Sequence, residues 1–153
     1  MINISVFSEE KAWSKRLKNK NLFFKKVCKA FPKKYRFSNK KVSLSLLLSN
    51  NKNIKKLNKN FRNKDKSTDI LSFPSSKKIT ISNNTYLGDI IISYEYLDKP
   101  KSQNLKLFNE KVIKLFIHGF LHLLGFDHKK NNDYFKMLRE EDILFKRIKS
   151  KLN

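Results

Sequence analysis

Cysteine is almost absent from this sequence, in which Cys28 is the only one. A single thiol excludes an intramolecular disulfide and a metal cluster held by several thiolates. Cys28 lies near Phe24, Val27 and Phe31 in a helical pattern. We therefore expect it to be a small buried hydrophobic residue, because free cysteine usually packs in this way.

Long apolar runs are also lacking, since no stretch reaches the 18 residues that would suggest a transmembrane helix. The first residues, MINISVFSEEKAW, lack the basic and continuously apolar regions of a signal peptide. There is no internal repeat and no linker, while apolar residues make up 39% of the chain. We therefore expect one globular domain over residues 1–153, located in the cytoplasm and not associated with a membrane.

Acidic residues are scarce, with 13 Asp and Glu against 35 Lys and Arg, which gives a formal net charge of +22. Such a charge favours a polyanionic partner, either nucleic acid or an acidic membrane surface. Most of the cations are lysines, and asparagine is abundant beside them. Both residues have A/T-rich codons, so a biased genome would produce the same charge. The composition is compatible with RNA binding and does not establish it.

Apolar patterning predicts an α+β fold with a single small mixed sheet of about four strands, packed with several helices in three layers or with one open face. The expected strands are residues 2–7, 42–49, 69–74 and 88–93, with a weak edge strand at 78–81. The expected helices are residues 9–31, 51–61 and 107–124.

A last helix is expected after the polar stretch KKNND. Its predicted apolar stripe consists of Phe135, Leu138, Phe145 and Ile148.

All three histidines lie in the segment HGFLHLLGFDH, residues 118–128. His118 and His122 are four residues apart on a predicted helix, so both imidazoles leave the same face. Gly125 fits the end of that helix, where a left-handed residue lets the chain turn back. His128 can then return over the same face as a third ligand. We predict a metal site, with zinc first and nickel, copper or iron also compatible with imidazole ligands.

Three protein ligands distinguish a catalytic site from a structural one, because structural zinc is normally closed by four. Asp127 is a possible fourth ligand, although fixing the turn or supporting an imidazole suits it better. An open position would bind water and lower its pKa toward 7. The histidine pattern therefore predicts a reactive site.

The spacing of the histidines is also that of the metzincin proteases, HExxHxxGxxH. Gly119 stands here where those proteases have the glutamate that acts as general base. This difference leaves the three metal ligands in place, but it removes the general base that a peptidase needs.

The segment HGFLHLLGFDH resembles the signature of the YbeY family, single-strand endoribonucleases of bacteria and organelles that mature ribosomal RNA. The stretches LNKNFRNKDKSTDILSFP (57–74) and LGDIIIS (87–93) agree, as does Met137 followed by Glu141. The similarity runs from about Leu57 to Phe145, and before that only the strand–helix–strand pattern matches. The resemblance implies a small α+β fold with a zincin-like metal helix, and one zinc ion held by the ligands His118, His122 and His128.

The resemblance also implies that Arg62, in the sequence NFR, is the catalytic residue of a cleft beside the metal. A guanidinium facing an open metal could clamp a phosphate bidentately and stabilise the charge that develops on it. The alternative is a solvated side chain at a helix end. A turn or strand-entry role is preferred for Thr68 and Asp69. For Ser72 and Asp89 two roles stay open, lining the cleft or completing the hydrogen bonds at a strand end.

The implied function is a zinc-dependent, single-strand-specific endoribonuclease that acts in 3′-end maturation of 16S ribosomal RNA and in ribosome quality control. The implied partners are the ribosomal RNA precursor and the small ribosomal subunit, with a ribosome-associated GTPase as a further candidate. One alternative is a non-catalytic ribosome-assembly factor that zinc holds together. The other is a metallopeptidase, which the missing glutamate disfavours. The oligomeric state is not determined by the sequence.

Overall fold

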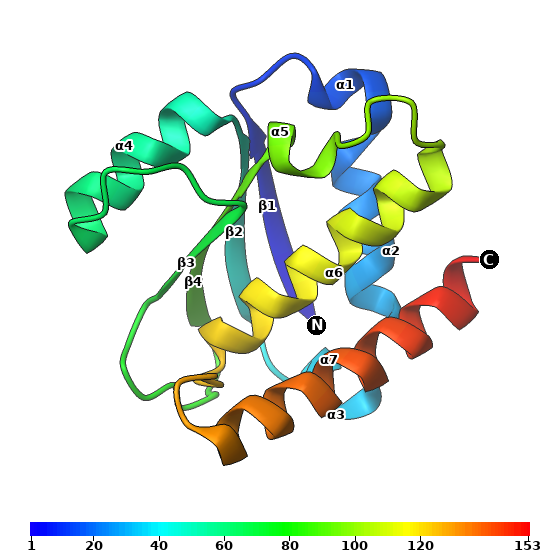
Figure 1. Cartoon of the computed structure of the whole chain (residues 1–153). Coiled ribbons are helices and arrows are strands. Elements are labelled where there is room, and N and C mark those ends of the chain that lie inside the picture. The colour runs from blue at the N-terminus through cyan, green and yellow to red at the C-terminus, as the bar shows by residue number, and fades with distance from the viewer.

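The computed structural model describes all residues from Met1 to Asn153. Four strands and seven helices follow one another along the chain (Figure 1). They are β1 (Ile2–Ser8), α1 (Trp13–Arg16), α2 (Lys20–Ala30), α3 (Lys33–Arg36), β2 (Val42–Ser49), α4 (Asn51–Arg62), β3 (Ile70–Pro74), β4 (Thr85–Ser93), α5 (Tyr94–Leu97), α6 (Leu105–Leu123) and α7 (Asn131–Leu152). None of the helices combines the length and the apolar character needed to cross a membrane.

The four strands form one mixed sheet in the order β1-β2-β4-β3. β1 and β2 are parallel, as are β2 and β4, whereas β3 runs antiparallel to β4. The predicted α+β fold with a small mixed sheet of about four strands is confirmed. β3 is an edge strand, and this position brings it next to the candidate site.

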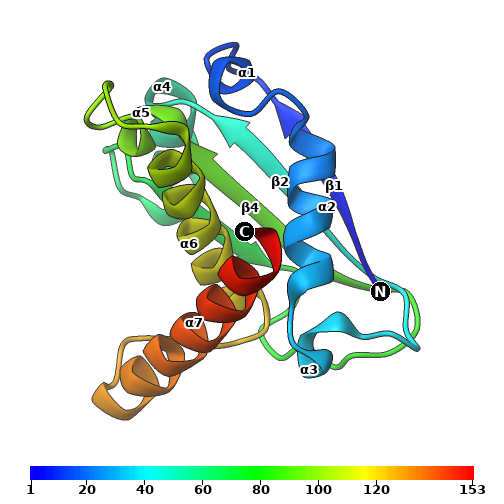
Figure 2. The same cartoon turned by 90° about the vertical axis from the view of Figure 1, so that its right-hand side faces the viewer.

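Helices cover the two faces of the sheet unequally. α2, α6 and α7 lie on one face, and α4 alone packs against the other (Figures 1 and 2). Leu44, Leu46 and Leu48 alternate along β2 and face the larger layer, where they join a cluster of 29 buried residues. A small separate cluster, Ile54, Leu71 and Ile91, lies under α4. The larger layer therefore contains most of the core.

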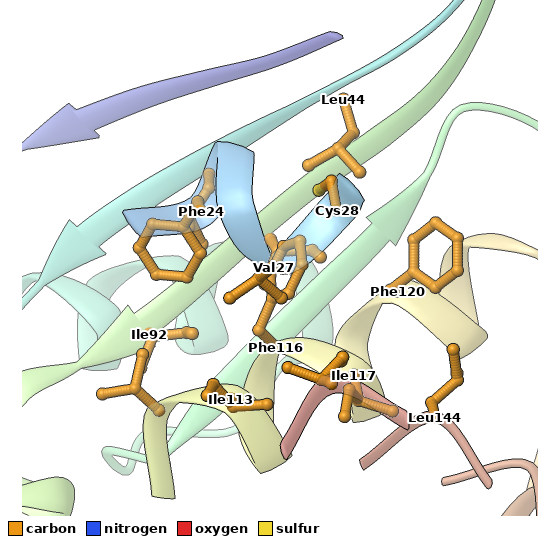
Figure 3. Packing of buried hydrophobic residues seen from close by; sticks show 14 of the residues in the cluster. Phe24, Val27, Cys28, Leu44, Ile92, Ile113, Phe116, Ile117, Phe120 and Leu144 are labelled. Carbon is orange, nitrogen blue, oxygen red and sulfur yellow. The ribbon is translucent and has the colours of Figure 1, made fainter. Parts of the chain in front are cut away.

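Cys28 is buried in this core, as the sequence predicts. Figure 3 shows it close to Val27 and Leu44. Burial raises the pKa of the Cys28 thiol to about 12, because a thiolate loses its hydration in an apolar environment. The residue is thus a packing element without a reactive thiolate at neutral pH.

The expected helix over residues 9–31 is wrong in one respect, because the chain breaks it in two. Leu17 has extended backbone angles, which end α1. The Asn19 side chain then accepts a hydrogen bond from the Leu22 amide and begins α2. Apolar periodicity continues across this break, so the pattern alone did not reveal it. The short helices α3 and α5 were also not predicted.

The weak edge strand expected at residues 78–81 is absent, and the chain from Ser75 to Asn84 forms no strand. The regular pairing of β3 with β4 ends at Pro74 and Gly88, followed by one further bond from the Ser75 amide to the Leu87 carbonyl at 2.9 Å. Ile79 and Ile81 are partly buried against the core. Their alternation therefore reflects the anchoring of a loop.

The apolar stripe expected on α7 is only partly correct. Ile148 is buried and Phe145 is partly buried, but Phe135 is 65% exposed and Leu138 is 47% exposed. The face that packs is Met137, Leu144 and Ile148, a set at helical spacing with Glu141 in its middle. That glutamate interrupted the apolar pattern in the sequence.

Because Cys28 is the only thiol, it can report on the opening of the core. At pH 8 we expect a thiol reagent to label the native chain about a thousandfold more slowly than the urea-unfolded chain, since a pKa near 12 leaves very little thiolate. Timed labelling measured by mass spectrometry checks this. Rapid labelling of the native chain would contradict it.

Candidate metal centre

The three histidines of the chain converge at one end of α6. His118 and His122 lie in its last two turns, and His128 lies in the connection to α7. Each histidine offers one ring nitrogen as a ligand, and these three nitrogens lie within 4.8 Å of one another. The prediction that this spacing gathers three imidazoles at one point is confirmed.

Gly125 makes the reversal between His122 and His128 possible. Its φ of +93° lies in the region that favours glycine. The Gly125 amide donates to the His122 carbonyl at 3.0 Å, and the Phe126 amide donates to the Leu121 carbonyl at 3.0 Å. This pair of bonds is the Schellman arrangement that ends many helices. The predicted helix end at Gly125 is therefore correct.

Two acceptors orient the imidazoles of α6. The Nδ1 atom of His118 lies 2.5 Å from the Glu141 carboxylate, and the Nδ1 atom of His122 lies 2.9 Å from the Phe126 carbonyl oxygen. A carbonyl or carboxylate oxygen accepts, so each Nδ1 carries the proton. Both Nε2 atoms are then unprotonated in the neutral rings. Such second partners fix the tautomer that binds a metal.

The two Nε2 atoms face each other at 3.1 Å. Two lone pairs at this distance repel each other unless a proton lies between the nitrogens, as in an N–H···N hydrogen bond, or a metal ion lies beside them. Two nitrogen ligands of a tetrahedral zinc stand about 3.3 Å apart, given Zn–N distances of about 2.0–2.1 Å. Burial, and then the neighbouring His118, lower the pKa of His122, which keeps its imidazole neutral. This pair of nitrogens fits a metal ion.

His128 is exposed, so the centre is open toward solvent on its side. The Asp127 carboxylate accepts the His128 amide at 2.7 Å. That hydrogen bond lowers the pKa of Asp127. Asp127 is thus engaged in the turn, the arrangement that the sequence favoured over metal binding.

Gly119 follows the first histidine and packs directly against the sheet. A Cβ at this position would lie 2.9 Å from Cδ1 of Ile70, 3.0 Å from Cγ2 of Ile90 and 3.0 Å from Oγ of Ser72. A glutamate side chain has no space there. The residue that a metzincin needs at this place is thus excluded by packing as well as by sequence.

Arg62 lies at the C-terminal end of α4, beside the free edge of β3. Its guanidinium donates to the carbonyl of Ser72 at 3.1 Å. Ser72 is buried, and its hydroxyl contacts Gly119, the neighbour of His118. One edge strand therefore separates Arg62 from the metal helix, and the catalytic role of Arg62 stays a prediction.

The other polar candidates have local partners. The Asp69 carboxylate accepts the Ile70 amide at 2.8 Å and the Thr68 hydroxyl at 3.2 Å. The Asp89 carboxylate accepts the Tyr86 hydroxyl at 2.8 Å. The contacts of Thr68 and Asp69 agree with a turn role, whereas Asp89 lies in the middle of β4 and not at its end.

Glu141 is the site residue to which sequence reasoning assigned no role. It comes from α7, 23 residues after His118, and binds the Nδ1 atom of that ligand. The signal available in the sequence was a polar residue at a position of α7 where the packing face requires an apolar one. Glu141 completes the face formed by Met137, Leu144 and Ile148.

Comparison with known proteins shows which family the chain resembles. Residues 5–149 match the family model described as "Endoribonuclease YbeY". The chain is 57% identical over 152 residues to the protein named Endoribonuclease YbeY from Pelagibacter ubique (strain HTCC1062), with 99% of each chain covered. It is 35% identical to the protein of that name from Sulfurihydrogenibium sp. (strain YO3AOP1), covering 88% of this chain and 92% of the relative.

The chain belongs to the YbeY endoribonuclease family. Its fold is similar to the solution structure of TM1509 from Thermotoga maritima, with a TM-score of 0.57, 24% identity and coverage of 98% and 90% of the two chains. The resemblance read from the histidine segment is thus confirmed, and it extends through the N-terminal third, where only a pattern had matched. As a YbeY family member the chain is an enzyme of the endoribonuclease class.

In this YbeY family member, replacing Glu141 should weaken the metal centre. We expect Glu141→Gln to reduce metal affinity about 10–100-fold, because loss of a ligand's second partner has effects of that size. Competition with a chromophoric chelator measures the affinity. Asp142→Asn is the matched control, since Asp142 pairs with Lys146 on the same helix. Equal affinities for Glu141→Gln and wild type would refute the role of Glu141.

Placing the metzincin glutamate into this YbeY scaffold should not create a peptidase. We expect Gly119→Glu to destabilise the chain by about 3 kcal/mol or more, because it overpacks the helix–sheet contact and buries a charge. Urea unfolding and a casein-cleavage assay measure the two effects. Lys114→Glu, on an exposed part of α6, is the control. Peptide cleavage by a stable Gly119→Glu variant would contradict the packing argument.

Proposed function

We propose that this chain is a zinc-dependent, single-strand-specific endoribonuclease of the cytoplasm that matures the 3′ end of 16S ribosomal RNA and acts in ribosome quality control. Its partners are the ribosomal RNA precursor and the small subunit, with a ribosome-associated GTPase as a further candidate. The observation that carries the proposal is a three-histidine centre with one exposed side, in a chain of this family. Imidazole-only ligation favours zinc among the transition metals.

His118, His122 and His128 would hold the ion. When bound, zinc supplies Lewis acidity toward a phosphoryl oxygen and lowers the pKa of a coordinated water. Glu141 keeps the proton on Nδ1 of His118, so that Nε2 stays directed at the centre. The exposed side of the centre leaves room for a phosphodiester.

Arg62 would bind the phosphate next to the centre. Only one of its nitrogens is engaged, with the Ser72 carbonyl, and a guanidinium has five N–H donors. The remaining donors can bind a phosphate bidentately and stabilise the charge that develops during cleavage. Because arginine keeps its proton at all working pH values, this contribution needs no titration.

No side chain near the centre is an evident general base, which leaves two nucleophiles. Either a water attacks the phosphorus, or the 2′-hydroxyl of the RNA does. Attack by the 2′-hydroxyl leaves a 2′,3′-cyclic phosphate on the product. Mass spectrometry of the product ends separates the two routes.

Metal content and RNA cleavage, measured together, test the proposal. We expect about one zinc per wild-type chain, and loss of both zinc and cleavage in His118→Ala. Arg62→Ala should keep zinc and fold but lose about 10²–10³-fold in cleavage rate, the usual effect of removing one donor to a developing charge. Arg62→Lys keeps the charge without the bidentate geometry and should recover only part of the rate.

The same variants distinguish the rival function, a ribosome-assembly factor that zinc holds together. If that function is correct, removing zinc unfolds the chain and Arg62→Ala still complements a strain lacking the protein. Identical cleavage by the wild type, His118→Ala and Arg62→Ala would mark the activity as contamination and refute the nuclease proposal. A peptidase has no support, because packing at Gly119 leaves no space for its general base.

A further inference from the structure

The segment from Asn51 to Lys66 is strongly basic. It contains seven cations, namely Lys52, Lys55, Lys56, Lys59, Arg62, Lys64 and Lys66, and one acid, Asp65. The segment comprises α4 and the turn after it, on the face of the sheet opposite α6 (Figure 1). Asp65 approaches Lys59 at 3.3 Å and Lys55 at 3.9 Å, so a single acid offsets little of the charge.

Packing directs these cations to solvent. Ile54 and Asn58 are buried on the inner side of α4, and the Asn58 side chain donates to the Lys66 carbonyl at 2.9 Å, which holds the turn against the helix. All seven cations are exposed. An exposed basic surface on a rigid helix is suited to a chain of phosphates.

Phe61 projects from the same helix and is 69% exposed, the highest value among the large apolar side chains. Its ring lies 5.4 Å from the ring of Phe73 on β3, measured between centroids, at an angle of 60°. The guanidinium of Arg62 lies 5.7 Å from the Phe73 ring centre. Two aromatic rings and a guanidinium thus form one cluster, and these are the groups on which unpaired bases stack.

A single strand, β3, lies between the cluster and the metal helix α6. Phe73 faces α4, whereas its neighbour Ser72 contacts Gly119 of α6. β3 has no strand on its outer side. A flexible polymer that lies at the metal centre can therefore pass around this edge and reach α4 without crossing the sheet.

The chemistry favours RNA over a protein as the occupant. A protein-binding surface usually has a contiguous apolar patch, whereas here one exposed ring lies on a helix whose other exposed positions are mostly cationic. Aromatic stacking combined with a lysine-lined track is typical of proteins that bind single strands with little sequence preference.

We infer that α4 is the holding surface for single-stranded RNA outside the catalytic centre, where Phe61 stacks on a base and Lys55, Lys56 and Lys59 bind the phosphates. The RNA strand runs from the metal centre around the free edge of β3 onto α4. This inference rests on the proposed function for the identity of the polymer. It adds the surface that holds the strand while cleavage takes place.

Fluorescence anisotropy with the zinc-loaded chain and a labelled, single-stranded 2′-O-methyl oligonucleotide of about twelve residues tests the stacking. We expect Phe61→Ala to weaken binding about tenfold, the effect of losing one stacked base, and Phe61→Trp to keep wild-type affinity. Phe135→Ala is the matched control, because Phe135 is 65% exposed on α7, on the other side of the sheet. It should bind like the wild type.

The lysines are tested by the salt dependence of the same binding. Replacing Lys55, Lys56 and Lys59 together by glutamine should reduce the slope of log affinity against log salt by about 2, since each phosphate contact on a single strand contributes about 0.7. The chain offers a control with the same spacing on α2, Lys25, Lys26 and Lys29, all exposed. Their replacement by glutamine should leave the slope unchanged.

Three outcomes would overturn the inference: no binding of the probe by the wild type, normal binding by Phe61→Ala or an unchanged slope in the α4 lysine variant, or an equal loss of slope in the α2 control. The last would mean that net charge alone attracts the strand. The 2′-O-methyl groups block attack by the 2′-hydroxyl, and electrophoresis of the probe after the measurement shows whether it has stayed intact, so that binding is measured separately from cleavage. A chain that cuts RNA while Phe61→Ala binds normally would refute this surface and leave the proposed function intact.

Discussion

The hydrogen bond between Glu141 and His118 links a predicted metal ligand on α6 to the N-terminal half of α7. The N-terminal half of α7 buries only Met137 and leaves Phe135 and Leu138 exposed. Polar contacts therefore help to hold it. Next to Glu141, the Glu140 carboxylate accepts the Tyr35 hydroxyl at 2.6 Å and the Lys34 ammonium at 2.9 Å. Two consecutive acids thus fasten α7 to α6 and α3, and one of them also sets the tautomer of a metal ligand.

The histidine centre could be predicted because its determinants are local. The His118–His122 spacing and the turn at Gly125 depend only on helix geometry within eleven residues. Glu141 could not be assigned in this way, because it meets His118 only through the packing of α7. The same residue concealed the buried face of α7, since a charge at a core-facing position breaks the apolar period.

The strands were predicted well for a related reason. β2 alternates between apolar residues and serine before it becomes fully apolar, which is the pattern of a strand at the centre of a sheet. The edge strand at 78–81 failed because the sequence shows alternation but not pairing partners. Likewise, the position of Arg62 beside β3 depends on how α4 docks on the sheet, which no local pattern encodes. The sequence singles out Arg62 as a candidate, but the residues that surround it are determined by tertiary packing.

The edge strand β3 also limits the insertions and deletions that the protein can tolerate. Ser72 packs against α6 on one face of β3, and Phe73 packs against α4 on the other face. The pairing of β3 with β4 determines which of the two residues faces which side. A slip of one residue in that register would exchange the two faces. Ser72 would then lie under Phe61, and the Phe73 ring would be forced against Gly119. Insertions or deletions within β3 would therefore damage both sides of the molecule at once.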